Sequence, residues 1–363
     1  MRRLALAAAG ALCKASALLA AGALCAASAL LAAGAAAGEP GFGPAPRDAE
    51  GRFLNLAGPL PGAVAAVVLP FQARRIWANF AGREGAAPRV ANDGRFLREN
   101  ARQSEPTVTW IGHATLLVQL GGLGFLTDPI WSERASPLSW LGPARLQPPG
   151  LALEDLPPVA FVVVSHNHYD HLDLPTLRRL ARRDPATRFL VPLGNGALLR
   201  EAGIAGVEEL DWGEVRRFGE VAVHCLPAQH WSARGPGDAR LALWASWAVV
   251  APERRFYFSG DTGFFEAFAR MGRRLGPFDL AALAIGAYRP EAMMRPLHLD
   301  PEEAVRAGRE LRAERLLGIH FGTFDLADEP LDEPPRRFRA AGAEAGYPAD
   351  RVWVLDVGET RAF

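Results

Sequence analysis

Six consecutive residues, His166 to His171, hold three imidazoles and a carboxylate in the order His-Asn-His-Tyr-Asp-His. The apolar run before them, residues 159–164, has the length and the β-branched content of a buried strand, so the cluster lies on the loop at that strand's carboxyl end. Side chains on such a loop can converge on one point. Neutral imidazole and carboxylate suit a borderline divalent ion such as zinc, whereas calcium and magnesium bind mostly oxygen ligands. The cluster therefore predicts a metal site, and the fold has to close around it.

Further candidate ligands follow later strand-like runs of the chain. They are His230, Asp261 and His320. Strand ends that meet at one edge of a sheet sandwich would bring these residues to the first cluster, which gives five His and two Asp in all. Seven protein ligands are too many for one tetrahedral zinc ion, but they fit two ions that keep open positions for water and substrate.

Beyond residue 105 the chain predicts strands and helices in two successive halves. Short apolar or alternating runs between turns predict strands at residues 108–111, 115–120, 124–127, 159–164, 189–192, 220–226, 243–250, 255–259, 280–285, 316–318 and 352–355. Helical spacing predicts helices at residues 174–183, 195–202, 264–271, 301–311 and 335–346. This order favours two sheets packed face to face with helices outside. Because no long linker interrupts it, we predict one domain at residues 105–363.

The first 38 residues have a basic start and a long Ala/Leu/Gly run that ends in a small-residue site at residues 35–37. These features are typical of an export signal. The uncharged stretch 15–37 is also long enough to span a bilayer, so a retained anchor is one alternative and a non-functional extension is another. A signal or an anchor predicts an exported protein that is periplasmic or associated with the inner membrane, whereas a non-functional extension leaves it in the cytoplasm.

Composition excludes some classes of function. The chain has 40 basic and 40 acidic residues, and the three basic residues of the leader leave the remainder at about −3, so nothing indicates nucleic-acid binding. Cys225 is the one cysteine after the leader, so no internal disulfide can form there. We expect Cys225 to be a buried apolar side chain.

An N-terminal arm, residues 39–104, lies between the leader and the predicted domain. It is rich in Gly, Pro and Arg, with an apolar island at residues 60–71 that is followed by Ile76 and Trp77. Two interpretations are open: the arm packs over the main domain, or it forms a surface that contacts lipid, with Arg near head groups and Trp at the interface.

Several motifs together resemble a known family. In chain order they are Trp-Ile-Gly-His-Ala-Thr at 110–115, Leu-Thr-Asp-Pro at 126–129, Ser-His-Asn-His-Tyr-Asp-His-Leu at 165–172, Gln-His-Trp at 229–231, Ser-Gly-Asp-Thr-Gly at 259–263, His-Leu-Asp-Pro-Glu-Glu at 298–303 and His-Phe-Gly-Thr-Phe at 320–324. In this order the chain resembles the metallo-β-lactamase fold, and within it the branch of the N-acylphosphatidylethanolamine-hydrolysing phospholipase D.

The resemblance implies an αββα four-layer sandwich that binds two zinc ions, with manganese or iron as alternatives. Its ligand assignment gives His166, His168 and His230 to one ion, Asp170, His171 and His320 to the other, and Asp261 to both. A water that bridges two such ions has a pKa lowered toward neutrality, so hydrolysis is the expected reaction.

Other residues near these motifs are candidates for supporting or substrate roles. The resemblance places Asp128 beneath the metal loop, where it would orient a ligand histidine through its free ring nitrogen. For His113 we expect a supporting or structural role. Trp231 and Tyr288 either line a substrate groove or pack in the core.

Asp170 and His298 are the candidate catalytic residues. His298 precedes a predicted helix with Asp300 as N-cap and Pro301 at its first position. A histidine fixed there would bind a phosphate oxygen or protonate the leaving alkoxide.

The leading hypothesis is a zinc-dependent phosphodiesterase of phospholipase D type that acts on lipids such as N-acyl phosphatidylethanolamine, with contact to a membrane surface. Within enzymes, a lactonase or another phosphodiesterase of the same fold is the alternative. A β-lactam hydrolase is disfavoured, because several of those enzymes use a Cys ligand where this chain has Asp261. Outside enzymes, the alternative is a metal-binding regulatory protein without turnover.

Overall fold

The computed structural model describes residues 41–60, 65–81 and 85–363. Residues 42–363 form one compact unit. The leader that the sequence predicts lies outside the described residues.

The first sheet is mixed. Among the described residues it has seven strands in the order β14 (Thr360–Ala362), β1 (Thr107–Gly112), β2 (Thr115–Leu120), β3 (Leu123–Thr127), β4 (Phe161–Val163), β5 (Arg188–Pro192) and β6 (Val207–Leu210). The β14–β1–β2–β3 part is antiparallel, and β3 to β6 are parallel. Helices α4 (Leu174–Arg183) and α5 (Gly196–Glu201) make the crossovers between β4, β5 and β6.

The second sheet mirrors this plan. In the described part of the chain it has seven strands in the order β13 (Val352–Trp353), β12 (Leu316–Ile319), β11 (Leu280–Ala284), β10 (Arg255–Phe258), β9 (Ser246–Val250), β8 (Val221–Leu226) and β7 (Val215–Phe218). Strands β7 to β10 are antiparallel and β10 to β13 are parallel. Helices α6 (Ala267–Leu275), α7 (Glu291–Met294), α8 (Pro301–Glu310) and α9 (Glu333–Glu344) lie in the connections.

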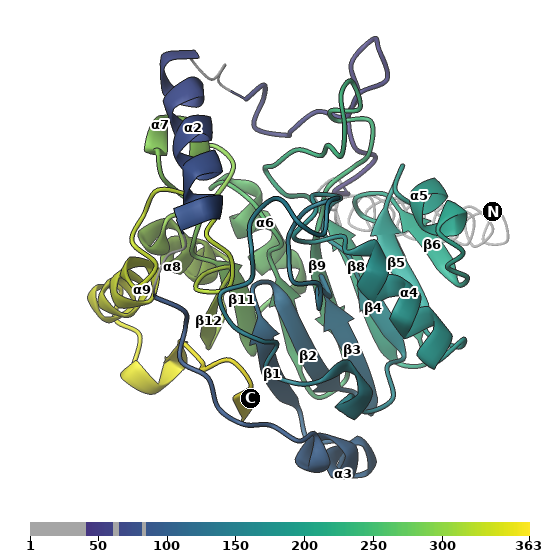
Figure 1. Cartoon of the computed structure of the whole chain (residues 1–363). Coiled ribbons are helices and arrows are strands. Elements are labelled where there is room, and N and C mark those ends of the chain that lie inside the picture. Colours follow the sequence, from purple (N-terminus) through teal and green to yellow (C-terminus); the bar gives the residue numbers. More distant parts are fainter. Residues whose placement is uncertain (1–40, 61–64, 82–84) are drawn as a thin grey trace, which may run out of the picture. The chain divides into compact units, whose positions relative to one another are not determined.

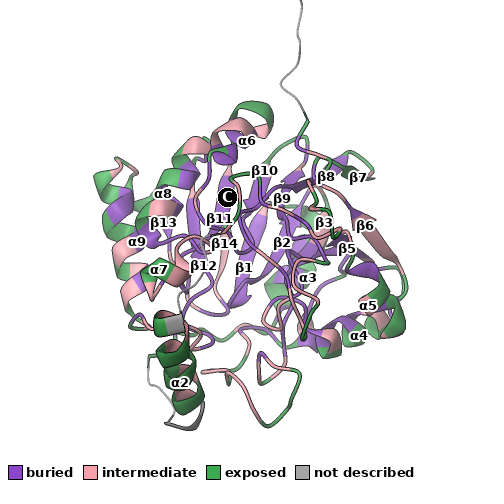
Figure 2. Ribbon diagram, turned by 90° about the horizontal axis from the view of Figure 1, so that it is seen from above, coloured by how far each residue is buried: buried purple, intermediate pink, exposed green. Residues whose placement is uncertain are grey.

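The two sheets pack face to face, with helices on the outer sides (Figure 1). Their facing side chains form one large core, in which the rings of Phe125 and Phe161 stack at 4.7 Å and Phe256 of the other sheet lies 5.9 Å from Phe125. Figure 2 shows the central strands as the buried layer of the molecule and the helices as partly exposed, whereas the edge strands β6, β7 and β14 are less buried. The predicted sandwich of two sheets with outer helices is confirmed.

Strand direction gathers the candidate ligands at one edge. Strands β10, β11 and β12 are parallel, and β8 runs the same way as β10 because β9 is antiparallel to both. Loops that follow these strands therefore leave from the same edge of the second sheet. The loop after β4 leaves the first sheet at the facing position.

Most of the predicted elements after residue 105 are present, with shifted ends. The helix predicted at residues 264–271 begins only at Ala267. Strands β6 and β7 were not predicted, because their sequences, Val-Glu-Glu-Leu and Val-Arg-Arg-Phe, are too polar for an apolar run and lie at the sheet edges. The very short α7 and β14 were also missed.

The arm contains two helices that no clear sequence pattern predicts, α2 (Ala65–Ala81) and α3 (Arg95–Gln103). Helix α2 is tied to the loop after β12, because Arg74 pairs with Asp328 at 2.5 Å and Arg75 pairs with Asp325 at 2.7 Å. None of the helices in the described part of the chain is both long and apolar enough to cross a bilayer.

Candidate metal centre

The loop after β4 is folded into a tight turn just before α4. The carbonyl of His168 accepts hydrogen bonds from the backbone N–H groups of His171 at 3.1 Å and Leu172 at 2.9 Å. These bonds close a turn immediately before α4. As a result, His166, His168, Asp170 and His171 all reach the centre from one short segment.

The first group of donor atoms joins this loop to the loop after β8. His166 Nε2 lies 2.8 Å from His168 Nδ1, and His230 Nε2 lies 3.3 Å from the same atom. His230 is held from behind, because its Nδ1 donates to the carbonyl of Leu297 at 3.0 Å. Three imidazole nitrogens thus face one point from two different sheets.

The second group lies beside the first. His171 Nε2 is 3.2 Å from His320 Nε2 and 3.2 Å from Asp170 Oδ2, and the two last atoms are themselves 3.5 Å apart. His113 also approaches this group, with its Nε2 3.0 Å from Asp170 Oδ2. Since a carboxylate oxygen only accepts, His113 donates to Asp170 and orients it. His113 thus contacts a candidate ligand, and its supporting or structural role stays a prediction.

Asp261 lies between the two groups. Its Oδ2 is 3.2 Å from His171 Nε2, and its Oδ1 is 3.1 Å from His320 Nε2. Toward the first group, Oδ2 is 4.0 Å from His166 Nε2 and 3.9 Å from His230 Nε2. A carboxylate in this place can serve a cation on either side.

The protonation states fit cation binding. Burial lowers the pKa of His168 to about 4 and that of His166 and His230 well below the ordinary value, so these rings are neutral and have a free lone pair. Burial also opposes charge on His171, but Asp261, Asp170 and Asp128 together outweigh it and raise the pKa of His171 well above its ordinary value. A divalent cation would supply the same positive charge between these carboxylates and displace that proton.

Asp128 lies beneath the loop, as the resemblance implied. It is fully buried, and its Oδ2 accepts a hydrogen bond from His171 Nδ1 at 2.7 Å. The bond leaves His171 Nε2 free to face the centre. His113, His320 and Asp128 all have positive φ, of 55°, 64° and 35°, which is uncommon for residues with side chains and concentrates at functional sites.

His298 lies next to the centre at the side of the first group. Its Nδ1 is 3.6 Å from Asp261 Oδ2, and its ring centroid is 5.1 Å from that of His230. The predicted cap of the following helix is confirmed, because Asp300 and Glu303 form a capping box at the start of α8. That helix start fixes the backbone just after His298.

Trp231 and Tyr288 differ in their surroundings. Trp231 is partly exposed, and its ring packs edge-on against that of His168 at 4.9 Å, so it borders the centre. Tyr288 is fully buried, and its hydroxyl donates to Glu333 at 2.7 Å. The idea that Tyr288 lines a substrate groove is therefore wrong, and its place is in the packing near α9. Cys225 is buried, as expected.

Three residues that support the centre were not singled out from the sequence. Asn55, in the arm, donates to the carbonyl of His230 at 2.8 Å and accepts from its backbone N–H at 3.0 Å. Ser165 contacts both Asp128 and His166. Arg234 donates to the carbonyls of Asn167 at 2.8 Å and Leu172 at 2.9 Å, behind the metal loop. No local pattern marks Asn55 or Arg234, because each acts on residues far away in the sequence.

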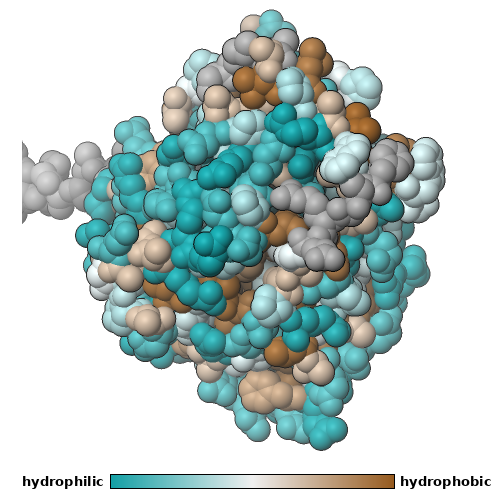
Figure 3. Space-filling view, turned by 60° about the vertical axis from the view of Figure 1, so that its left-hand side comes forward, coloured by the Kyte–Doolittle hydropathy of each residue, from teal (hydrophilic) through white to brown (hydrophobic). Residues whose placement is uncertain are grey.

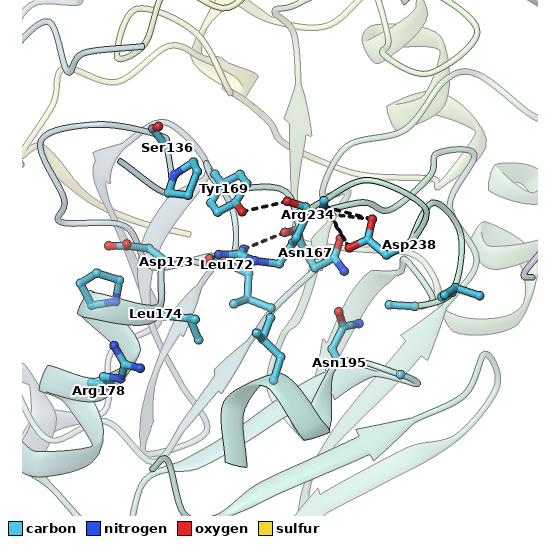
Figure 4. A pocket seen from close by; sticks show the side chains of 17 residues that line it. Ser136, Asn167, Tyr169, Leu172, Asp173, Leu174, Arg178, Asn195, Arg234 and Asp238 are labelled. Carbon is cyan, nitrogen blue, oxygen red and sulfur yellow. Dashed lines mark hydrogen bonds between the residues drawn. The ribbon is translucent and has the colours of Figure 1, made fainter. Parts of the chain in front are cut away.

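Figure 4 shows the Arg234 contacts at the wall of a cavity of about 640 Å³. The guanidinium lies 4.0 Å from the centroid of the Tyr169 ring, and the Tyr169 hydroxyl donates to the Arg234 carbonyl. Asn167 and Tyr169 line this cavity, but none of the seven candidate ligands does. The loop thus presents its ligands to the centre and its intervening side chains to this cavity.

Comparison with known proteins decides the family. Residues 124–321 match the family model described as "Beta-lactamase superfamily domain". The chain belongs to the β-lactamase superfamily. Its sandwich, its ligand loops and its relatives identify this superfamily member as a metal-dependent hydrolase of the metallo-β-lactamase fold.

Curated relatives point to one branch of the superfamily. The chain is 46% identical over 238 residues to "N-acyl-phosphatidylethanolamine-hydrolyzing phospholipase D 1" of Caenorhabditis elegans, an alignment that covers 63% of this chain and 67% of that protein. It is 44% identical over 261 residues to an uncharacterized protein of Mycobacterium tuberculosis, covering 70% and 68%. The mitochondrial phospholipase D of the same name from Saccharomyces cerevisiae is 33% identical, covering 70% and 55%.

Solved structures share the fold of this superfamily member. Igni18, a metallo hydrolase from Ignicoccus hospitalis, matches with a TM-score of 0.55 at 23% identity, covering 71% of this chain and 98% of that one. The isothiocyanate hydrolase from Delia radicum gut bacteria matches with a TM-score of 0.56 at 22% identity, covering 71% and 99%. At these identities the likeness is one of fold.

Proposed function

We propose that this hydrolase is a phosphodiesterase of the phospholipase D type, that it acts on N-acyl phosphatidylethanolamine-like lipids, and that it uses two zinc ions. The observation that carries the proposal is a pair of histidine groups with Asp261 between them. It occurs in a chain 46% identical to a phospholipase D named for that lipid.

The two groups divide the donor atoms between two ions. His166, His168 and His230 would hold one ion, Asp170, His171 and His320 the other, and Asp261 would serve both. When bound, such ions lower the pKa of water and offset the negative charge of a phosphodiester. Manganese and iron are the alternatives, which metal analysis of the purified protein distinguishes.

His298 is the residue that we assign to the phosphate. It is buried to 8% exposure beside Asp261, yet it is surplus to the seven ligands. From this place it can donate a hydrogen bond to a phosphate oxygen or protonate the leaving alkoxide. Asp170 takes part as a ligand that His113 holds in place.

Exposed apolar side chains on helix α2 favour the proposal of a lipid substrate. Leu69, Ile76 and Trp77 lie along one stripe of the helix and have exposed fractions of 64%, 61% and 72%. Figure 3 shows exposed hydrophobic residues at the top of the view, the level at which α2 lies in Figure 1. Exposed apolar side chains beside arginines suit an interface with lipid head groups.

The substrate test is a panel of lipids and soluble esters, incubated with purified protein whose metal content is known, with products identified by mass spectrometry. We expect release of a phosphatidic acid from N-acyl phosphatidylethanolamine, and no release by Asp261→Ala. If the protein hydrolysed only a lactone or only a different phosphodiester, the proposed lipid substrate would be wrong. Bound metal without turnover on the whole panel would favour a regulatory protein.

The lipid surface has its own test. Ile76→Ser with Trp77→Ser should reduce co-sedimentation with phosphatidylethanolamine vesicles and leave hydrolysis of a small soluble phosphodiester unchanged. Val215→Ser is the matched control, because Val215 is also exposed, at 42%, but lies on the edge strand β7. Equal vesicle binding by parent and double variant would assign α2 a packing role only.

A further inference from the structure

One buried carboxylate lies within reach of both donor groups. Asp128 accepts three hydrogen bonds: from His171 Nδ1 at 2.7 Å, from the Ser165 hydroxyl at 2.5 Å and from the Ser165 backbone N–H at 2.6 Å. The Ser165 Oγ also lies 2.9 Å from His166 Nδ1. His171 and His166 belong to different groups of candidate ligands. Together with Asp128 and Ser165 they form one hydrogen-bonded network beneath the centre.

The proton positions in this hydrogen-bonded network follow from the number of donors and acceptors on each side chain. A serine hydroxyl has one proton and two lone pairs, and an ionised carboxylate only accepts. The Ser165 proton therefore goes to Asp128, and Ser165 Oγ is left to accept from His166 Nδ1–H. With its proton on Nδ1, the ring of His166 has a bare Nε2, which is the atom 2.8 Å from His168 Nδ1.

The surroundings hold Ser165 in this position. Its carbonyl accepts a hydrogen bond from the backbone N–H of Ala245 at 2.8 Å. On the other side lies Gly260, where an added Cβ would come within 2.4 Å of the Ser165 Cβ. Ser165 is only 1% exposed. A small side chain with a hydroxyl fits where the loops of the two sheets touch.

We propose that Ser165 is a positioning residue that connects Asp128 to His166. One carboxylate then sets the ring tautomer of a ligand in each group, acting on His171 directly and on His166 through the Ser165 hydroxyl. This inference rests on the two-ion centre of the proposed function, but it does not depend on which substrate is hydrolysed.

The decisive experiment measures metal affinity. Metal-free Ser165→Ala is titrated with Zn²⁺ against a chelator, and ¹¹³Cd²⁺ NMR reports on the two ions separately. Removing a partner that orients a ligand typically costs about 10- to 100-fold in metal affinity. We expect a loss of that size for the ion of the His166 group and a shift of its ¹¹³Cd resonance, while the ion of the His171 group changes less than about threefold.

Two variants complete the comparison. Ser246→Ala is the matched control, because Ser246 is also fully buried and its hydroxyl donates to a carbonyl, that of Pro227, at 2.9 Å. It should leave both affinities unchanged. Asp128→Asn should weaken the binding of both ions, because it removes the negative charge and replaces one of the two acceptor oxygens by a donor amide. Equal weakening of both ions in Ser165→Ala, or a change no larger than that in Ser246→Ala, would overturn the inference.

A measurement on the parent protein covers the case in which Ser165→Ala does not fold. Long-range ¹H–¹⁵N NMR of the zinc-loaded parent should show His166 protonated on Nδ1, and protonation on Nε2 contradicts the inference. Failures of the two proposals remain distinct. Two bound ions with no lipid turnover would overturn the substrate and leave the role of Ser165 standing.

Discussion

The two sheets supply the metal centre in different ways. The first sheet provides four of the seven candidate ligands from one loop of six residues, His166 to His171. The second provides His230, Asp261 and His320 one at a time, from loops after three different strands. The first half of the centre is therefore local in sequence, whereas the second exists only because β8, β10 and β12 point the same way.

This contrast explains what the structure has to hold in place. The local half is closed by its own turn and needs a few contacts from outside, such as those of Arg234 and Asp128. The dispersed half depends on the registers of a whole sheet and on the large core beneath it. Replacing a ligand of the dispersed half should therefore disturb more of the metal centre than replacing a ligand of the local half.

The largest expected effect comes from Asp261, the dispersed ligand between the groups. We expect Asp261→Ala to lose both ions, with a loss of affinity beyond the about 10- to 100-fold typical of a residue that only orients a ligand. His168→Ala removes a ligand of the local half and should keep about one ion, because it touches only the first group. Elemental analysis after zinc loading and dialysis measures both. Parent-like metal content in Asp261→Ala would contradict its place between the ions.

The next effect concerns His298, which the dispersed half holds beside the centre without needing it as a ligand. His298→Ala should keep its metal and its melting temperature and lose at least roughly tenfold in turnover of a phosphodiester. If His298 protonates the leaving group, the loss shrinks for a nitrophenolate ester, since that group needs little protonation. An equal loss for both esters means that His298 positions the phosphate. Loss of metal would make it a ligand.

The same contrast decides what the sequence could predict. The loop from His166 to His171 is evident without a structure, because its density is local. The partners His230, Asp261 and His320 were found because each follows an apolar strand. Asn55 could not be found, because it meets His230 across 175 residues of chain and lies in an arm without a clear pattern. For Tyr288 the sequence left groove and core open for the same reason, since only the fold places Glu333 at its hydroxyl.

Arg234 tests how far the local half depends on the other sheet. It follows β8, yet it donates to two carbonyls of the first sheet's loop, those of Asn167 and Leu172, whose residues are both buried. We expect Arg234→Ala to lower the free energy of unfolding by about 2–4 kcal/mol, because each carbonyl loses its partner. Arg178→Ala, which removes a bond on the exposed surface of α4, should cost less than about 0.5 kcal/mol. Equal urea midpoints for the two variants would show that the loop from His166 to His171 is stable without Arg234.

The smallest expected effect concerns His224, which lies apart from the other seven histidines of the chain. Seven gather at the centre, and His224 lies within β8. Burial, with Arg217 and Arg274, lowers the pKa of His224 to about 4. Between pH 6.5 and 4 the unfolded chain therefore binds more protons at this position, so the stability from the neutral ring is complete above pH 6.5 and is lost as the pH falls toward 4.

His224→Gln should leave the metal content unchanged and make the free energy of unfolding fall less between pH 7 and pH 5. The difference should be about 1 kcal/mol or less, because the ring is partly exposed to screening solvent. Urea unfolding of the metal-free parent and variant at both pH values measures it as a double difference, which cancels the other seven rings. An identical fall in both proteins would show that His224 titrates as it does in the unfolded chain.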